Sequence, residues 1–181
     1  MSTQLAEKTV YAIDPAHTTV EFVVRHLMIS KVRGRFSGVV GTIELQSGND
    51  VPSAVEARID TATIDTRESQ RDDHLKSADF FDVAKYPALE FVSGRIEGTP
   101  SGFTIAGDLT IAGVTRPVAL KAEFEGRGPD PWGGQRIGYS AWATINRKDF
   151  GLTWNAALET GGVVVGDEVR IELNVEAILQ K

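Results

Sequence analysis

The sequence predicts an all-β fold in which antiparallel strands, each with one buried face, close on one another as a barrel or a sandwich. The clearest observation is an alternation near the C-terminus, where apolar residues occupy every second position from 169 to 177 and charged or polar residues stand between them. Side chains of a strand alternate between two faces, so this segment buries one face. The pattern recurs along most of the chain, and only residues 65–81 have the character of a helix.

Strands are expected where an alternating segment is bounded by turn residues. After a flexible lead-in of residues 1–9, a first strand ends at Asp14-Pro15. The next strand places Phe22, Val24 and His26 on one face, although Val23 makes the opposite face partly apolar as well. In order, the strands are expected at residues 10–13, 18–26, 36–45, 55–59, 88–96, 102–111, 118–124, 137–146 and 163–179, which makes eight or nine.

The stretch from 65 to 81 breaks the strand pattern because it lacks β-branched residues apart from Thr66 and is densely charged. Asp65 and Glu68 stand three residues apart, as in a capping box. Three apolar residues follow at helical spacing, namely Leu75, Ala78 and Phe81. This pattern predicts one amphipathic helix near residues 66–81, which lies on the barrel or plugs one end.

Composition limits the classes of partner. The chain of 181 residues fits a single domain, and a 41% hydrophobic fraction with 24% charged residues is typical of a soluble globular protein. Its apolar runs are too short for stable membrane insertion. A net charge of -6 with scattered cations argues against binding to nucleic acid. Residues 1–8 show no signal-peptide pattern, so we expect a cytoplasmic protein, or a periplasmic or secreted one if a signal was removed.

The sequence contains no recognisable catalytic, metal or cofactor motif. Cysteine is absent, and we find no nucleophile elbow, zincin helix or phosphate-binding loop. His17 and His26 are nine residues apart, which would place them on opposite faces of one continuous strand, and His74 stands on the polar side of the expected helix. His26 has two interpretations: a buried histidine that donates to backbone or carboxylate, or a polar anchor inside a cavity.

The alternation stops after Ile145, and a polar cluster at residues 146–149 leads into Phe150-Gly151 and then Trp154. One interpretation is a strand corner, in which Arg147 pairs with a carboxylate and Gly151 supplies a permissive dihedral angle. The other is the rim of a binding site. There Arg147 or Lys148 would hold an anionic or carbonyl head group, and Phe150 and Trp154 would contact an apolar tail.

Six segments in order along the chain carry a resemblance to a known family. They are Tyr11–Thr18 with Val20, Phe22 and His26; Gly34–Phe36; Gly41–Ile43; Ala78–Val83 with Tyr86-Pro87; Leu109–Val118; and Asn146–Gly151. Together they resemble the YceI-like family, the polyisoprenoid-binding proteins. The resemblance implies a single domain over residues 1–181, built as an extended eight-stranded antiparallel lipocalin-like barrel. It also implies a lumen that holds a long isoprenoid or another amphiphile, no catalytic group, and a homodimer in several members.

The leading hypothesis is therefore a non-catalytic protein that binds, transports or sequesters a long isoprenoid or fatty amphiphile, such as a polyprenyl or quinone lipid, in its barrel. Two alternatives stay open: an enzyme that modifies a lipid or quinone with a lumen histidine, and a stress-associated structural dimer whose interior is filled by its own side chains. The lipid hypothesis requires an apolar hollow. Its candidate ligand-binding residues are Phe22, Val24, His26, Phe36, Leu109, Ile111, Arg147, Phe150 and Trp154.

Overall fold

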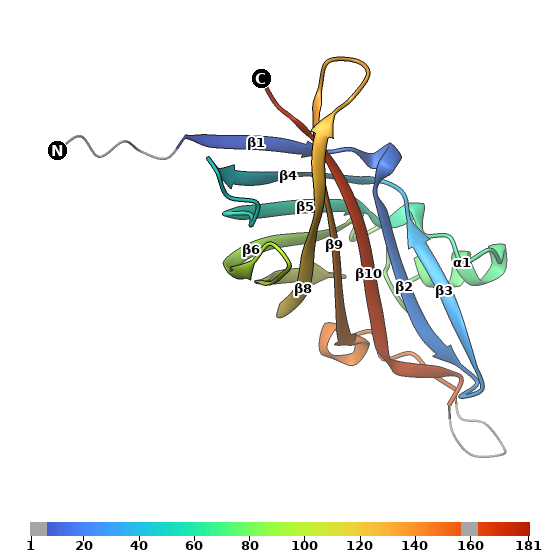
Figure 1. Ribbon diagram of the computed structural model, residues 1–181. Helices are drawn as coiled ribbons and strands as arrows, with labels where there is room; N and C mark the ends of the chain where they lie inside the picture. Colours follow the sequence, from blue (N-terminus) through green and yellow to red (C-terminus); the bar gives the residue numbers. More distant parts are fainter. Residues whose placement is uncertain (1–6, 157–162) are drawn as a thin grey trace.

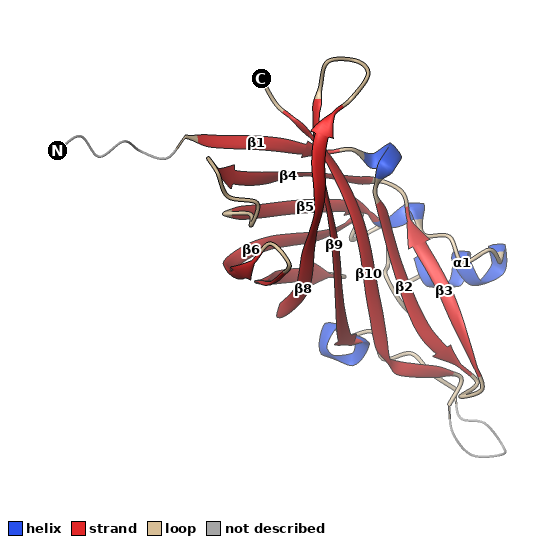
Figure 2. Cartoon of the chain, in the orientation of Figure 1, coloured by secondary structure: helices blue, strands red, loops and turns tan. Residues whose placement is uncertain are grey.

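The computed structural model describes residues 7–156 and 163–181, and these residues are mostly strands (Figure 2). Short helical segments connect some of the strands: the 3-10 helices η1 (Pro15–His17), η2 (Thr61–Thr63) and η3 (Arg147–Phe150), and the α-helix α1 (Ser69–Lys76). The strands are β1 (Lys8–Ile13), β2 (Thr19–His26), β3 (Ser30–Phe36), β4 (Val39–Gln46), β5 (Ala54–Asp60), β6 (Ala88–Thr99), β7 (Gly102–Ile111), β8 (Val114–Pro129), β9 (Gln135–Asn146) and β10 (Val165–Leu179).

Eight of these strands close an antiparallel barrel, as predicted. The pairing runs β1-β4-β5-β6-β7-β8-β9-β10, and β10 pairs again with β1. Strand β10 is long enough to take two neighbours in succession on the same edge: its C-terminal end pairs with β1, and its first part pairs with β2. In Figure 1, β1, β4, β5 and β6 run across the view, whereas β8, β9, β10, β2 and β3 cross it steeply.

The β2–β3 hairpin extends the wall of the barrel beyond the closed ring, and β3 was not predicted. The prediction began a strand at Phe36, whereas Phe36 ends β3 and the connection Ser37-Gly38 separates it from β4. The cause is Gly34, which stands where the alternation would need an apolar side chain and which pairs with Phe22 on β2. The ring of Phe22 covers the glycine so closely that a Cβ there would lie 2.1 Å from it.

The segment that follows β5 lies beside the free edge of β3 (Figure 1). Arg35 and Asp65 exchange backbone hydrogen bonds of 3.0 and 2.9 Å, which attach this segment to the hairpin. Its helix α1 is shorter than the predicted 66–81, because the Glu68 carboxylate caps the first turn at Gln70 N and Arg71 N, and Ser77 ends the helix. Turns carry the rest of the segment to β6.

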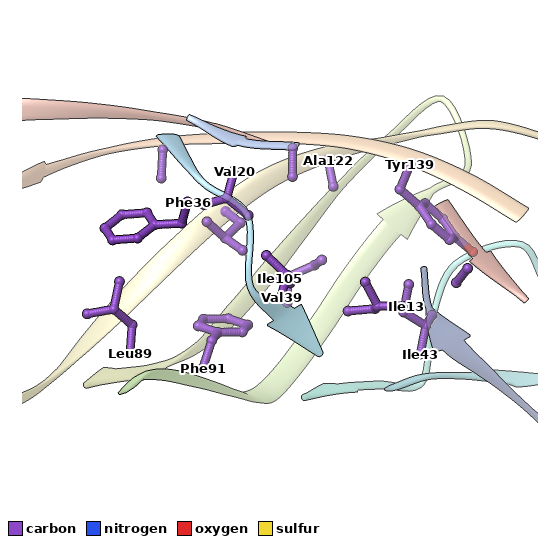
Figure 3. Close-up of a cluster of buried hydrophobic side chains, with 14 of the residues drawn as sticks. Ile13, Val20, Phe36, Val39, Ile43, Leu89, Phe91, Ile105, Ala122 and Tyr139 are labelled. Atoms are coloured by element: carbon purple, nitrogen blue, oxygen red, sulfur yellow. The ribbon is translucent and has the colours of Figure 1, made fainter. Parts of the chain in front are cut away.

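The side chains on the inner faces form the apolar interior. In Figure 3, Leu89 and Phe91 of β6 face Val20 and Phe36 across this interior. Strand β1 begins at Lys8, earlier than expected, and the first six residues of the predicted lead-in lie outside the described residues. Within the described part of the chain, each helix is too short and too polar to cross a membrane.

An apolar cavity inside the barrel

The barrel is hollow. It contains a partly open cavity of about 230 Å³ to which all ten strands contribute residues. One water molecule needs only about 10–15 Å³ on a comparable measure, so this volume is far above the small voids of a packed core. Small residues on the wall help to leave the space: Ala141 of β9 stands between Ala122 of β8 and Leu173 of β10, and all three line the cavity. The interior that the lipid hypothesis required is present.

Four of the 34 residues that line the cavity have polar side chains, namely Thr18, Glu21, Tyr139 and Arg147. The Thr18 hydroxyl donates to the carbonyl of Glu176 at 3.3 Å, and the Tyr139 hydroxyl donates to the carbonyl of Asp50 at 2.7 Å. Burial raises the pKa of Tyr139, so its hydroxyl stays protonated and keeps donating. Glu21 belongs to the face of β2 opposite Val20 and Phe22.

Arg147 is the most deeply buried charged side chain among the described residues, with 3% of its surface exposed. Its guanidinium donates to four backbone carbonyls: Leu152 at 2.6 Å, Trp154 at 2.9 Å, Gly166 at 2.8 Å and Val165 at 3.3 Å. The Asp167 carboxylate lies 3.7 Å away. Burial lowers the pKa of Arg147, and Asp167 partly opposes this. An arginine has five N–H donors, so few are left for a ligand.

This arrangement supports the strand-corner interpretation of residues 146–151. The Asn146 side chain accepts from Lys148 N at 3.0 Å and caps η3. Gly151 ends η3 with a φ of +75°, in the left-handed region that glycine adopts without a steric penalty. Arg147 then ties this corner to the start of β10: its guanidinium donates to the carbonyls of Val165 and Gly166, and it also pairs with the Asp167 carboxylate, as this interpretation expected.

The predicted ligand-binding residues fall into two groups. Six of them line the cavity: Phe22, Val24, Phe36, Leu109, Ile111 and Arg147. Their contact with a ligand stays a prediction.

The other three predicted residues, His26, Phe150 and Trp154, do not line the cavity. His26 ends β2, beyond the part of the strand that faces the cavity, because the hairpin turn follows at once. Phe150, the last residue of η3, is 2% exposed and packs in the core. Trp154 packs against Phe80, with ring centroids 5.4 Å apart, and Phe80 itself lines the cavity.

The sequence analysis missed several contributors from outside the strands. Phe80 and Phe81, in the turns after α1, line the cavity together with Leu75 of α1. Helical spacing had marked Leu75 and Phe81 as the inner side of the segment, but Phe80 was not singled out. The Phe80-Phe81 pair in an otherwise charged stretch was the available signal. Further contributors are Pro52, Leu152 and Val165.

A separate polar cluster at the ends of β1 and β10 brings together metal-ligating residue types. Asp14, His17 and Glu176 offer ligand atoms within 4.8 Å of one another. However, Arg136 donates to the Asp14 carboxylate at 2.7 Å and to the Glu176 carboxylate at 2.8 Å. The hydrogen bond from Arg136 to Asp14, with that from His17, lowers the pKa of Asp14. The arginine supplies the positive charge that a cation would otherwise bring, so this cluster is explained as an ion-pair network.

Comparisons with a family model and with known proteins point to the same family. The model of the YceI-like domain matches residues 11–177. Protein YceI of Escherichia coli is 38% identical over 173 residues, which cover 94% of this chain and 87% of that protein.

Two solved structures are similar in fold. The crystal structure of the Campylobacter jejuni YCEI protein superposes with a TM-score of 0.75 at 30% identity, covering 87% of this chain and 90% of that one. A polyisoprenoid-binding domain from Saccharophagus degradans superposes with a TM-score of 0.64 at 16% identity, covering 92% and 97%. The second comparison supports the fold alone.

Proposed function

Because this chain belongs to the YceI-like family and its barrel is hollow, we propose that it is a non-catalytic carrier that binds the tail of an isoprenoid or another amphiphilic lipid inside the barrel. The observation that carries this proposal is the apolar cavity of about 230 Å³. The structural neighbour from Saccharophagus degradans that binds a polyisoprenoid agrees with this class of ligand.

The energy for binding would come from burial of the tail. Each methylene that leaves water for an apolar site gains about 0.8 kcal/mol. A ten-carbon segment would therefore gain roughly 8 kcal/mol before the cost of association is subtracted. Affinity should rise with tail length until the cavity is full.

The head group would stay outside the cavity or at its edge. Hydrogen bonds to the protein's own carbonyls engage the Thr18 and Tyr139 hydroxyls and most donors of Arg147. A buried head group would therefore lose its hydrogen bonds to water without gaining replacements, which costs free energy. We expect the protein to distinguish lipids by their tails and to tolerate different head groups.

Two features argue against the alternative functions. An enzyme that uses a lumen histidine needs the imidazole beside the bound lipid, whereas the described residues that line the cavity include no histidine. A structural dimer with a filled interior has no reason to keep an empty space, which costs stability. Dimerisation of the carrier itself remains compatible with the proposal.

Native mass spectrometry would test the proposal. Protein purified without detergent, and then delipidated, should gain the mass of one added polyprenol, and longer tails should bind more tightly than shorter ones. A matched set of lipids with one tail and an alcohol, carboxylate or quinone head should differ much less. Failure to bind any isoprenoid or fatty lipid would remove the carrier function, and a strict dependence on head group would contradict the tail-based mechanism.

A further inference from the structure

The tip of the β2–β3 hairpin exposes a group of apolar side chains that the cavity does not explain. Ile29 is 83% exposed and Met28 is 46% exposed, and Leu27 precedes them in the turn. Figure 1 shows the hairpin reaching away from the body of the barrel. Leu27 is half-buried, whereas the exposed side chains of Met28 and Ile29 are unfavourable in water.

The backbone of this tip makes the choice of residues more unusual. Leu27 and Met28 have φ values of 53° and 61°, in the left-handed region. Positive φ at both central residues of a hairpin turn favours Asn and Gly, because a Cβ is crowded there. The turn is nevertheless ordered: Ile29 N donates to the carbonyl of His26 at 3.2 Å, and Leu27 N donates to the carbonyl of Val164 at 2.8 Å. Apolar residues are thus held at the outermost point against both local preference and solvation.

The charged residues around the tip indicate which kind of partner surface would be complementary to it. Between residues 22 and 36 the chain has four cations, namely Arg25, Lys31, Arg33 and Arg35, and no acidic residue, although its net charge is -6. Arg25 and Lys31 flank the tip and are exposed, and neither takes part in an ion pair among the described residues. An apolar tip flanked by cations is complementary to an anionic lipid bilayer, whose acyl region accepts the apolar residues and whose head groups accept the cations.

The hairpin also connects this tip to the cavity. Val20, Phe22 and Val24 line the cavity along β2, and the tip begins three residues after Val24. Val165, which pairs with His26 at the base of the tip, lines the cavity as well.

From these observations we infer that the tip formed by Leu27, Met28 and Ile29, with Arg25 and Lys31 beside it, docks on an anionic membrane surface, where the carrier collects or releases its lipid. This inference rests on the proposed carrier function. Docking is peripheral, because only the tip of one hairpin would enter the interface.

The test compares binding to phosphatidylcholine vesicles with and without roughly a third of phosphatidylglycerol, at about 0.1 M salt, by co-sedimentation. The key variant is Leu27→Asn, Met28→Gly, Ile29→Ser. It removes the apolar tip and introduces the Asn-Gly pair that this turn prefers, so the fold should be retained or stabilised. We expect wild-type protein to prefer the anionic vesicles and the variant to bind them at least about tenfold more weakly.

Matched controls separate this site from the rest of the surface. Trp132→Ser removes a side chain that is 80% exposed in the loop between β8 and β9, and it should leave vesicle binding unchanged. Lys31→Gln should weaken binding to anionic vesicles about fivefold and leave binding to neutral vesicles unchanged. Lys121→Gln, at an exposed position of β8, should change neither.

Two results would overturn the inference. One is a binding pattern without a role for the tip: wild-type protein does not bind anionic vesicles, or Trp132→Ser abolishes binding while the tip variant keeps it. The other is a tip variant that turns a dimer into a monomer in sedimentation without affecting vesicles, since a second copy would then cover the tip. Loading with polyprenol dispersed without vesicles is measured in parallel. Wild-type protein that loads polyprenol normally but does not bind anionic vesicles rejects only the docking site, whereas wild-type protein that fails to load rejects the carrier function.

Discussion

Replacing Ala141 by leucine should stabilise the lipid-free protein and weaken lipid binding at the same time. The side chain of Ala141 borders the cavity between Ala122 and Leu173, so the larger residue has room to enter the empty space. In a solid core the same change would overpack the site and cost about 1–3 kcal/mol.

The magnitude follows from the three carbons that leucine adds. At about 0.8 kcal/mol each they gain about 2.4 kcal/mol by burial, from which roughly 0.5–1 kcal/mol of side-chain entropy is lost. The net gain of about 1.5–2 kcal/mol corresponds to a rise of roughly 3–8 °C in Tm for a chain of this size. The same three carbons displace part of the tail, so lipid affinity should fall roughly 50-fold.

The assay is thermal unfolding of delipidated protein followed by circular dichroism, with polyprenol titration by native mass spectrometry. Ala119→Leu is the matched control, because Ala119 is exposed on the outer face of β8. It should change neither quantity. A lower Tm for Ala141→Leu would show that the space is not available, and an unchanged lipid affinity would show that the tail does not occupy it.

Three further variants probe two positions at the cavity and the ion-pair network of Asp14. Arg147→Met should lower the free energy of unfolding by about 3 kcal/mol or more in urea titrations, because several buried carbonyls lose their hydrogen-bond donor. A stable variant that no longer binds lipid would instead show that Arg147 binds the head group of the lipid. Gly34→Ala should push the Phe22 ring toward the cavity, which lowers the free energy of unfolding by about 1–3 kcal/mol and weakens lipid binding. A double-mutant cycle with Phe22→Ala should show that the two effects are coupled. Simple additivity of the two effects would contradict this steric account. The hydrogen bond from Arg136 holds the pKa of Asp14 below its ordinary value of 3.8, so this carboxylate stabilises the fold above about pH 4, and its contribution is lost as the pH falls through the lowered value. Asp14→Asn should therefore flatten the fall in Tm below pH 4. An unchanged dependence of Tm on acid pH would show that the ion pair contributes nothing to stability.

The strand pattern could be predicted from the sequence because alternation is a local property. The strands expected at residues 102–111, 118–124 and 137–146 lie within β7, β8 and β9. The prediction failed where a long-range contact replaced the local signal. Strand β3 was not predicted because Gly34 interrupts its apolar alternation, and the ring of Phe22 from the neighbouring strand covers this glycine. The sequence of β3 alone does not contain that contact.

The residues of the cavity likewise divide into those that the local pattern predicts and those that only long-range contacts explain. The sequence placed Phe22, Leu109 and Ile111 on apolar faces, and these faces line the cavity. It could not assign Arg147, since the carbonyls that saturate its guanidinium come from two segments that meet only in the folded chain. Helical spacing likewise could not reveal that Phe80 turns inward after α1 has ended.

By itself the sequence determined the class of the fold and the apolar character of its interior, because the period of two and the choice of side chains are written into each strand. Only the tertiary structure decided that the interior stays hollow. The volume of the cavity is a property of the closed barrel, because it is the space left between facing walls. That space depends on the strand pairing, on the register that places small residues such as Ala122 and Ala141 side by side, and on the segment beside β3.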